Sequence, residues 1–354
     1  MTLKYAFDDL HRLVTELFTR AGLSHERAAV MADVFIEADL LGFSTHGMNR
    51  VPRNLAWLHA GSSRAEGAPH VLIDHGNIFN WDAEFLPGPW VVMQAVETAL
   101  ARVPEHGLVT ATIRRSQHIA CLAVYCVRIV EAGYVALLTC STPAENTVCA
   151  QGGIAPVFSA NPIAFAAPME DQPLLFDISM SVTAGGYVMR AQREGKPLPE
   201  ACLKDNLGNI TDRPEAFFSD PPGSILPIGG ACHGYKGAAL SILTEVLSMA
   251  LGGYGRADKR SRDDGAANSV FLQIIDPGAF GDTALFQQQL VALRNLYENS
   301  GAASEDVRFP GRRAWARRSK QLREGVELYP TIMEDIKPWA EKLDVALPKP
   351  IGGI

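Results

Sequence analysis

The sequence lacks the features of several common protein classes. It contains no apolar run of roughly 18 residues, the length a membrane-spanning helix needs. The N-terminal stretch MTLKYAFDDLHRL has no continuous apolar segment, so we expect no secretory signal. The formal net charge is -7, so no overall basic field attracts nucleic acid. We therefore expect a cytoplasmic protein with neither a membrane nor a nucleic acid as its partner.

Cysteine is sparse and irregularly spaced. None of the cysteines forms a CxxC pair, and most have apolar neighbours. We therefore expect buried free thiols in a reducing cytoplasm rather than a disulfide framework. An HExxH motif and paired Cys/His spacings are also missing, so the sequence predicts no metal site. The six cysteines are at positions 121, 126, 140, 149, 202 and 232.

Two common nucleotide-binding motifs are absent as well. A P-loop does not occur, and the nearest approach to GxGxxG is Gly253-Tyr254-Gly255. That stretch follows a predicted helix rather than a strand, and it lacks the third glycine. The pattern disfavours a classical dinucleotide-binding domain.

What the sequence does contain is typical of a globular α/β protein. It is 47% hydrophobic and 20% charged over 354 residues, enough for two domains or for one large core with added helices. Apolar spacing predicts a strand, a helix and a second strand between residues 108 and 140, a unit with a right-handed crossover. Polar residues 203–224 are predicted to be loop. Helices are predicted over residues 7–20, 25–41, 48–60, 89–102, 187–193, 238–251 and 283–299.

The segment STHGMNR at 44–50 holds the first candidate site. His46 can exchange a proton near neutral pH, and Thr45 can hydrogen-bond the imidazole or a substrate oxygen. Arg50 can bind a carboxylate through two parallel N–H bonds. These residues suggest proton transfer on a small carboxylate. The alternative is a corner between two helices, with Thr45 as a cap and an incidental histidine.

Three further segments carry polar groups at places where ligands bind. His118 follows a predicted strand, and Lys236 stands at a glycine-flanked helix start. Each has a purely structural alternative, a backbone-bonded helix residue for His118 and a solvated side chain for Lys236. A basic run near the C-terminus is either a solvated helix face or a site for a phosphorylated cofactor. Its members are Arg308, Arg312, Arg313, Arg317, Arg318, Lys320 and Arg323.

Six motifs in order resemble the malate/L-lactate dehydrogenase family of the second type, which includes ureidoglycolate dehydrogenase, 2,3-diketogulonate reductase and Δ1-piperideine-2-carboxylate reductase. The resemblance covers nearly the whole chain. It rests on STHGMNR at 44–50, SQH at 116–118, SANPIAFAAP at 159–168, FDISMS at 176–181, GYKGAAL at 234–240 and FPGRR at 309–313.

The resemblance implies an α/β, non-Rossmann nicotinamide-binding fold with a mixed β-sheet flanked by helices, usually a homodimer. It implies an N-terminal helical part over 1–75 with the catalytic histidine, a mixed-sheet core over 76–300 and a C-terminal helical tail over 301–354. His46 and Thr45 match the catalytic positions, and Arg50 matches the substrate-carboxylate position. Ala160 and Asn161 match further substrate contacts. The implied cofactor-binding residues are His118, Ile119, Ala120, Cys121, Leu122, Asp177, Ile178, Ser179, Ser181, Tyr235, Lys236, Gly311, Arg312 and Arg313.

Two departures from the family pattern bear on the substrate. Ala160 stands where the family often has a threonine that touches substrate. Gly185-Gly186-Tyr187 stands where imine reductases have His-Gly-Asp, so a carboxylate partner for the histidine is missing.

The resemblance predicts an NAD(P)-dependent oxidoreductase that interconverts a 2-oxo acid and a 2-hydroxy acid. Reduction of a cyclic imino acid or of 2,3-diketogulonate is the alternative activity, and a binding protein without catalysis is the alternative of another class. The cofactor is NAD or NADP. Arg312 or Arg313 is predicted to contact an adenosine 2′-phosphate and favour NADP.

Overall fold

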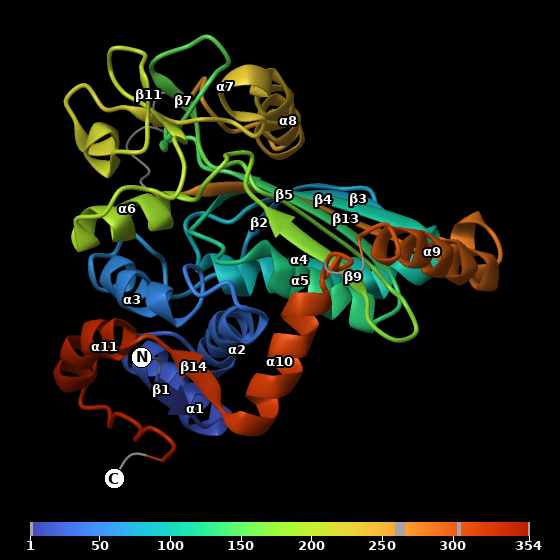
Figure 1. The fold of residues 1–354 in the computed structure, drawn as a ribbon. Coiled ribbons are helices and arrows are strands. Elements are labelled where there is room, and N and C mark those ends of the chain that lie inside the picture. The colour runs from blue at the N-terminus through green and yellow to red at the C-terminus, as the bar shows by residue number, and fades with distance from the viewer. Residues whose placement is uncertain (1–2, 259–265, 303–305, 353–354) are drawn as a thin grey trace.

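The computed structural model describes residues 3–258, 266–302 and 306–352. Within these residues a seven-stranded mixed sheet lies between layers of helices (Figure 1). Its strand order is β2-β3-β4-β13-β5-β8-β9. The predicted fold class is therefore confirmed. The strands are β2 (His70–Asp74), β3 (Ile78–Asp82), β4 (Leu108–Ser116), β5 (Val135–Ser141), β8 (Ile163–Ala167), β9 (Leu174–Ile178) and β13 (Asn268–Ile275).

The centre of this sheet is the predicted strand-helix-strand unit with one strand inserted. β4 and β5 are joined by α5 (Leu122–Glu131) and run in the same direction. β13 comes much later in the chain, lies between them and is antiparallel to both. The start of β13 therefore lies beside the ends of β4 and β5.

Helices cover both faces of the sheet. α4 (Gly88–His106) and α5 pack on one face, and α8 (Tyr235–Glu245) contacts β5 on the other (Figure 1). The π-helical segment Val246–Ala250 continues α8 and contacts β5 and β13. These layers bury the largely apolar central strands on both sides, as expected of central strands in an α/β sheet.

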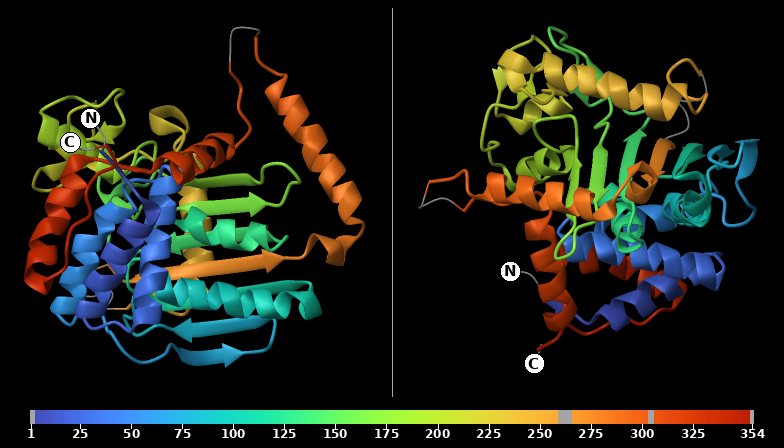
Figure 2. Two further views of the ribbon diagram at one scale, coloured as in Figure 1. Left: turned by 90° about the horizontal axis from the view of Figure 1, so that it is seen from below. Right: turned by 90° about the vertical axis from the view of Figure 1, so that its right-hand side faces the viewer.

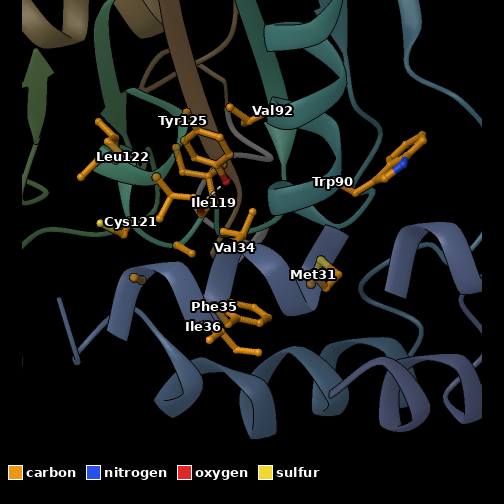
Figure 3. Close-up of a cluster of buried hydrophobic side chains, with 14 of the residues drawn as sticks. Met31, Val34, Phe35, Ile36, Trp90, Val92, Ile119, Cys121, Leu122 and Tyr125 are labelled. Atoms are coloured by element: carbon orange, nitrogen blue, oxygen red, sulfur yellow. Dashed lines mark hydrogen bonds between the residues drawn. The ribbon is translucent and has the colours of Figure 1, made fainter. Parts of the chain in front are cut away.

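α2 (His25–Leu41) lies beyond α4 and α5, and most of its residues from Met31 onward are buried. Ser24 caps its start, and Gly42 ends it in a left-handed conformation. Its predicted bounds are confirmed. Figure 3 shows buried apolar side chains of α2, α4 and α5 in one cluster, with Val34 on the side of α2 toward α5 and Phe35 on the opposite side. They include Met31, Val34, Phe35, Ile36, Trp90, Val92, Leu122 and Tyr125.

The two ends of the chain meet on the outer side of α2. β1 (Leu3–Tyr5) pairs with β14 (Val326–Leu328), and α10 (Arg312–Glu324) packs on α2. The other helices of this layer are α1 (Phe7–Arg20), α3 (Val51–His59) and α11 (Pro330–Leu343). The three-part division of the chain stays a prediction, although β2, within the first part, belongs to the large sheet.

A smaller five-stranded sheet lies beyond the other face, in the part of the chain that the structure describes. Residues 203–224, predicted to be loop, supply three very short strands of it. Two-residue strands carry too little periodicity to be recognised in a sequence. The strands are β6 (Val148–Cys149), β7 (Pro156–Phe158), β10 (Leu203–Lys204), β11 (Ile210–Thr211) and β12 (Ser224–Ile225), and the nearby helices are α6 (Gly185–Glu194) and α7 (Gly230–His233).

The structure also bears on the predicted free thiols and on the expected lack of membrane-spanning helices. All six cysteines lie in described residues and are free thiols, five of them buried and Cys232 exposed. The prediction of buried free thiols is confirmed for the five. Across the described ranges, each helix is too short or too polar to cross a lipid bilayer.

Candidate active site

The candidate residues gather at one end of the large sheet. Strands β4 and β5 end there, and Asn268 and Ser269 of β13 begin opposite Ser116 and Ser141. β8 begins and β9 ends at the same edge, with Ile163 opposite Ile178. Loops that leave adjacent strands at a common edge are well placed to surround a ligand.

The segment that carries His46 is a tight turn between α2 and α3. The His46 N–H donates to the Phe43 carbonyl, and the Arg50 N–H donates to the Gly47 carbonyl. Residues Met48–Arg50 form a single 3-10 turn that leads into α3. The predicted helix from residue 48 is confirmed, and Arg50 stands at its start.

His46 is held by a hydroxyl and a second imidazole. Thr45 Oγ1 lies 2.8 Å from His46 Nδ1. The rings of His46 and His118 are stacked, with centroids 5.6 Å apart. Burial, and then the nearby Arg50 cation, lowers the pKa of His46 to about 3. The imidazole is therefore neutral at pH 7 and can accept a proton.

His118 is fixed in one neutral form. The Ala120 N–H donates to His118 Nδ1 at 3.0 Å, so the ring proton resides on Nε2. Burial and then Arg50 lower the pKa of His118 well below its ordinary value. Asn268 Oδ1 accepts the Ile119 N–H at 3.0 Å and so anchors the same loop. The site thus presents a fixed N–H donor beside His46.

Arg50 has no ion-pair partner among the described residues, although the Glu145 carboxylate acts on it electrostatically. Its buried Nε has no hydrogen-bond partner, and the guanidinium forms no ion pair within the described residues. Burial, then the Arg53 cation, lowers the pKa of Arg50 to about 10, so it stays charged at pH 7. An unpaired buried charge is costly. The position therefore favours binding of an anion.

Asn161 and Ala160 support the site from within the chain. Asn161 is fully buried, and its Nδ2 donates to the Ser241 carbonyl at 3.1 Å and to Glu245 Oε1 at 3.2 Å. Its Oδ1 accepts from the Ser159 hydroxyl. The Ala160 carbonyl accepts the Met180 N–H at 2.9 Å. In this conformation both residues hold loops together, and the Asn161 amide has its partners within the protein.

Asp177 caps α5. Its Oδ2 accepts the Ala123 N–H at 3.0 Å and lies 3.3 Å from Cys121 Sγ. Burial raises the pKa of this carboxyl, whereas the α5 amides act in the opposite direction. Ile119 to Leu122 are almost fully buried, so their side chains belong to the core. The loop 118–122 and Asp177 thus lie side by side, and their cofactor-binding role stays a prediction.

The segment after β9 leads toward the start of α8. The Ser179 and Ser181 hydroxyls lie 2.9 Å apart, and Ile178 is exposed. Ser181 pairs with Pro227 in an isolated bridge, and the next residue, Ile228, contacts the α8 start. Tyr235 and Lys236 are exposed at that start, and Lys236 forms no ion pair with the described residues.

The segment Gly311–Arg313 lies at the opposite end of β9. The Leu175 N–H donates to the Pro310 carbonyl, and a Cβ on Gly311 would lie 2.8 Å from the Leu175 nitrogen. Arg312 is exposed and pairs with Glu298 through both carboxylate oxygens. Arg313 is exposed and forms no ion pair within the described chain.

Three residues of the site were missed in the sequence. Asp39 accepts the Met48 N–H beneath the His46 turn. Asn268 anchors the His118 loop, and the Trp57 ring lies 6.5 Å from the His118 ring. Asp39 offered a signal, since it is a carboxylate within the apolar stripe of a predicted helix. The roles of Asn268 and Trp57 arise from long-range packing, so no local sequence signal could have identified them.

Known proteins resemble this chain along nearly its whole length. A (2R)-3-sulfolactate dehydrogenase (NADP(+)) from Chromohalobacter salexigens is 30% identical over 96% of this chain and 99% of its own. A Δ1-pyrroline-2-carboxylate/Δ1-piperideine-2-carboxylate reductase from Pseudomonas putida is also 30% identical, over 95% of this chain and 96% of its own.

The fold is shared too. The structure of malate dehydrogenase from Pyrococcus horikoshii OT3 superposes with a TM-score of 0.87 and 23% identity, covering 98% of this chain and 97% of that chain. The sequence profile described as malate/L-lactate dehydrogenase matches residues 5–337. The reaction is therefore that of an oxidoreductase with a nicotinamide cofactor, and the chain belongs to the malate/L-lactate dehydrogenase family.

Proposed function

We propose that this oxidoreductase interconverts a small 2-hydroxy acid and the matching 2-oxo acid, with His46 as the acid–base group and Arg50 as the carboxylate-binding group. The observation that carries the proposal is Arg50, half-buried, with a buried Nε that has no partner among the described residues, beside two neutral imidazoles. A carboxylate is the planar anion that a guanidinium binds through two hydrogen bonds. Bound there, the substrate has its hydroxyl-bearing carbon within reach of the imidazoles.

In the oxidation direction His46 takes the hydroxyl proton. This role requires the tautomer in which neutral His46 donates Nδ1–H to Thr45 Oγ1, 2.8 Å away, and keeps the Nε2 lone pair for the substrate. When bound, the nicotinamide supplies the acceptor for the hydride that leaves the same carbon. His46 is then cationic, and Thr45 still accepts its Nδ1–H.

In the reduction direction His46 must hold a proton when the 2-oxo acid is bound. The substrate carboxylate favours this condition, because it offsets the Arg50 charge, which is the smaller of the two causes, after burial, that lower the pKa of His46. The bound acid therefore raises the pKa of its own proton donor. His118 offers its Nε2–H to the same oxygen or to the nicotinamide carboxamide.

The cofactor residues fit a dinucleotide with two anionic regions. Lys236 and Arg313 are exposed cations without an ion pair among the described residues, and each can bind a phosphate. β9 separates the His118 end from Arg313, and its five residues span roughly 15 Å. This separation supports nicotinamide binding beside His118 and adenosine binding beside Arg313. Arg313 is then the residue that favours NADP.

The cyclic imino acid is the second candidate, favoured by the reductase from Pseudomonas putida. The chemistry at His46 and Arg50 would be the same, with a C=N bond in place of C=O. Tyr187 stands where a carboxylate is expected for that reaction, and it is exposed beside Arg190. The 2-hydroxy acid is therefore the better supported substrate class.

A homodimer is the proposed assembly, and α9 (Thr283–Glu298) supports it. All of α9 is described and none of its residues is buried, although Leu285, Leu293 and Leu296 are apolar. The helix lies at the outer end of the sheet (Figure 2). An isolated helix of this length is marginal in water, so it needs a partner surface. Sedimentation velocity on Leu296→Glu, with the exposed Leu322→Glu on α10 as control, tests this, and a wild-type monomer contradicts it.

The free thiols support a cytoplasmic location, since an oxidising compartment favours disulfides. Localisation of a tagged full-length chain by microscopy or by cell fractionation tests this proposal, and recovery from an extracytoplasmic fraction contradicts it.

A substrate panel tests the proposed activity. Pyruvate, oxaloacetate, 2,3-diketogulonate and piperideine-2-carboxylate are each assayed with NADH and NADPH. We expect the highest kcat/KM with pyruvate or oxaloacetate, and a higher value with 2,3-diketogulonate favours that alternative substrate. A kcat/KM at least tenfold higher with the cyclic imine assigns the enzyme to the second candidate, and no turnover with any of them contradicts both.

A further inference from the structure

A buried carboxyl group lies directly beneath the catalytic turn. Asp39 is on α2 and is 1% exposed. Its Oδ2 accepts the Met48 N–H at 2.7 Å. Met48 is two residues from His46, so the hydrogen bond fixes the backbone that carries the imidazole.

The turn approaches this carboxyl group too closely for any side chain. A Cβ on Gly47 would lie 2.2 Å from Asp39 Oδ2 and 2.8 Å from Oδ1. Contacts of that length do not occur between real atoms. The glycine in the THG motif is therefore required by the close approach of the Asp39 carboxyl group.

Within the described part of the chain, the Asp39 carboxyl group lacks the hydrogen-bonded ion pair that would stabilise a purely structural buried carboxylate. Its Oδ1 has no hydrogen-bond partner among the described residues. Arg317 of α10 is the cation that acts on it, and the Arg317 Nε is also buried without a partner. Burial raises the pKa of Asp39 to about 7, although the Met48 N–H and the Arg317 cation both act to lower it. A buried group this costly is expected to serve the site above it.

α10 reinforces the same place from the other side. Gln321 Nε2 donates to the Asp39 and Leu40 carbonyls, each at 2.9 Å. Arg317 packs against Gly42, where α2 ends. The end of α2 is thereby held rigid up to the start of the catalytic turn.

We propose that Asp39 is a positioning residue for the reaction, which holds the Gly47–Met48 backbone so that His46 faces the substrate bound by Arg50. The inference rests on the proposed role of His46. Loss of the Met48 hydrogen bond lets the turn move, and a misplacement of about 1 Å can lower a rate by roughly 10²-fold. Such a loss affects kcat and leaves cofactor binding intact.

The test compares Asp39 with Glu37, a matched carboxylate on the same helix. Glu37 is also largely enclosed and pairs with Arg318 of the same α10, but among the described residues it has no hydrogen bond or ion pair to the turn. We measure kcat, substrate KM and the dissociation constant of NADH and NADPH for Asp39→Ala, Asp39→Asn, Glu37→Ala and Glu37→Gln. Circular dichroism and thermal unfolding report whether each variant folds.

We expect Asp39→Ala to lower kcat by about 10²-fold with cofactor affinity within about twofold of wild type. Asp39→Asn keeps a carbonyl oxygen for the Met48 N–H and should recover most of that loss. Glu37→Ala and Glu37→Gln should lose stability but keep kcat. A folded Asp39→Ala with wild-type kcat overturns the proposal, as does an equal loss of kcat in Glu37→Ala.

Two further variants keep the test decisive. If Asp39→Ala does not fold, Gly47→Ala separates the turn from an intact Asp39 and should show the same loss of kcat, and wild-type kcat there overturns the proposal. His46→Ala is assayed in parallel. A folded Asp39→Ala with wild-type kcat and an inactive His46→Ala reject the Asp39 inference alone, whereas a fully active His46→Ala rejects the proposed function.

Discussion

Arg50 and Arg312 were both predicted to bind anions, and their surroundings differ. Arg50 has a buried Nε and no anionic partner in the described chain, next to His46 and His118. Arg312 is exposed and already paired with Glu298. An enclosed unpaired cation costs stability unless a ligand neutralises it, whereas an exposed pair costs and gains little. The comparison supports the proposed carboxylate site at Arg50 over one at Arg312.

The largest expected effect comes from removing the enclosed cation. Arg50→Met should lower kcat/KM for a 2-oxo acid by roughly 10³-fold, because the substrate carboxylate then enters an enclosed site without its counter-ion. Steady-state kinetics measure this. Arg312→Met is the matched control and should leave kcat/KM for the acid within about twofold at saturating cofactor. Equal losses in the two variants would remove the distinction between the sites.

A pH titration sharpens the same comparison at His46. Burial and Arg50 lower the pKa of His46 to about 3, so the folded protein keeps it neutral where an unfolded chain, with a histidine pKa of about 6.5, binds a proton. Its contribution to stability is therefore present above pH 6.5 and is lost as the pH falls toward 3.

Histidine-selective NMR follows that ionisation directly, with the signal assigned through His46→Gln. We expect His46 to stay unprotonated between pH 8 and pH 5 in the free enzyme. Even pH 5 lies roughly 2 units above its pKa of about 3. A bound 2-hydroxy acid should raise the pKa, because its carboxylate neutralises Arg50. A midpoint near 6.5 in the free enzyme, unchanged by the acid, would argue against an uncompensated Arg50.

The smallest effect is expected at the exposed arginines. Arg313→Met should weaken NADPH binding by roughly tenfold and NADH binding little, since one charge-assisted pair to the 2′-phosphate is lost. Arg312→Met should change either affinity by no more than about twofold, because Glu298 already occupies Arg312. Nicotinamide fluorescence titrations measure both. A larger loss at Arg312 than at Arg313 would reverse the assignment.

Much of the fold was readable from local patterns, and the exceptions have physical reasons. Helix α1 has clear apolar periodicity, α2 has the Ser24 cap and the Gly42 end signal, and the bounds of both agree with the prediction. The insertion of β13 between β4 and β5 depends on pairing across more than a hundred residues, which no local pattern records. α9 shows the converse, since its amphipathic pattern predicted the helix but not its exposed position.

The reactive side chains of the candidate site could be predicted from the sequence, but the residues that hold those side chains in place could not. His46 and Arg50 stand in one short motif, and the structure brings His118 to them. Asp177 was assigned to cofactor binding, and its carboxylate caps α5 in the structure, a role that needs the three-dimensional contact to be seen. The use of the Asn161 amide within the protein is of the same kind.

The most direct test of the central claim is the rate of hydride transfer in a single turnover of His46→Gln. The variant is loaded with reduced cofactor and mixed with the best 2-oxo acid, and nicotinamide absorbance is followed. If His46 delivers the proton while Arg50 holds the carboxylate, the rate should fall by about 10²- to 10⁴-fold with cofactor affinity unchanged. Hydride transfer at the wild-type rate would contradict the account.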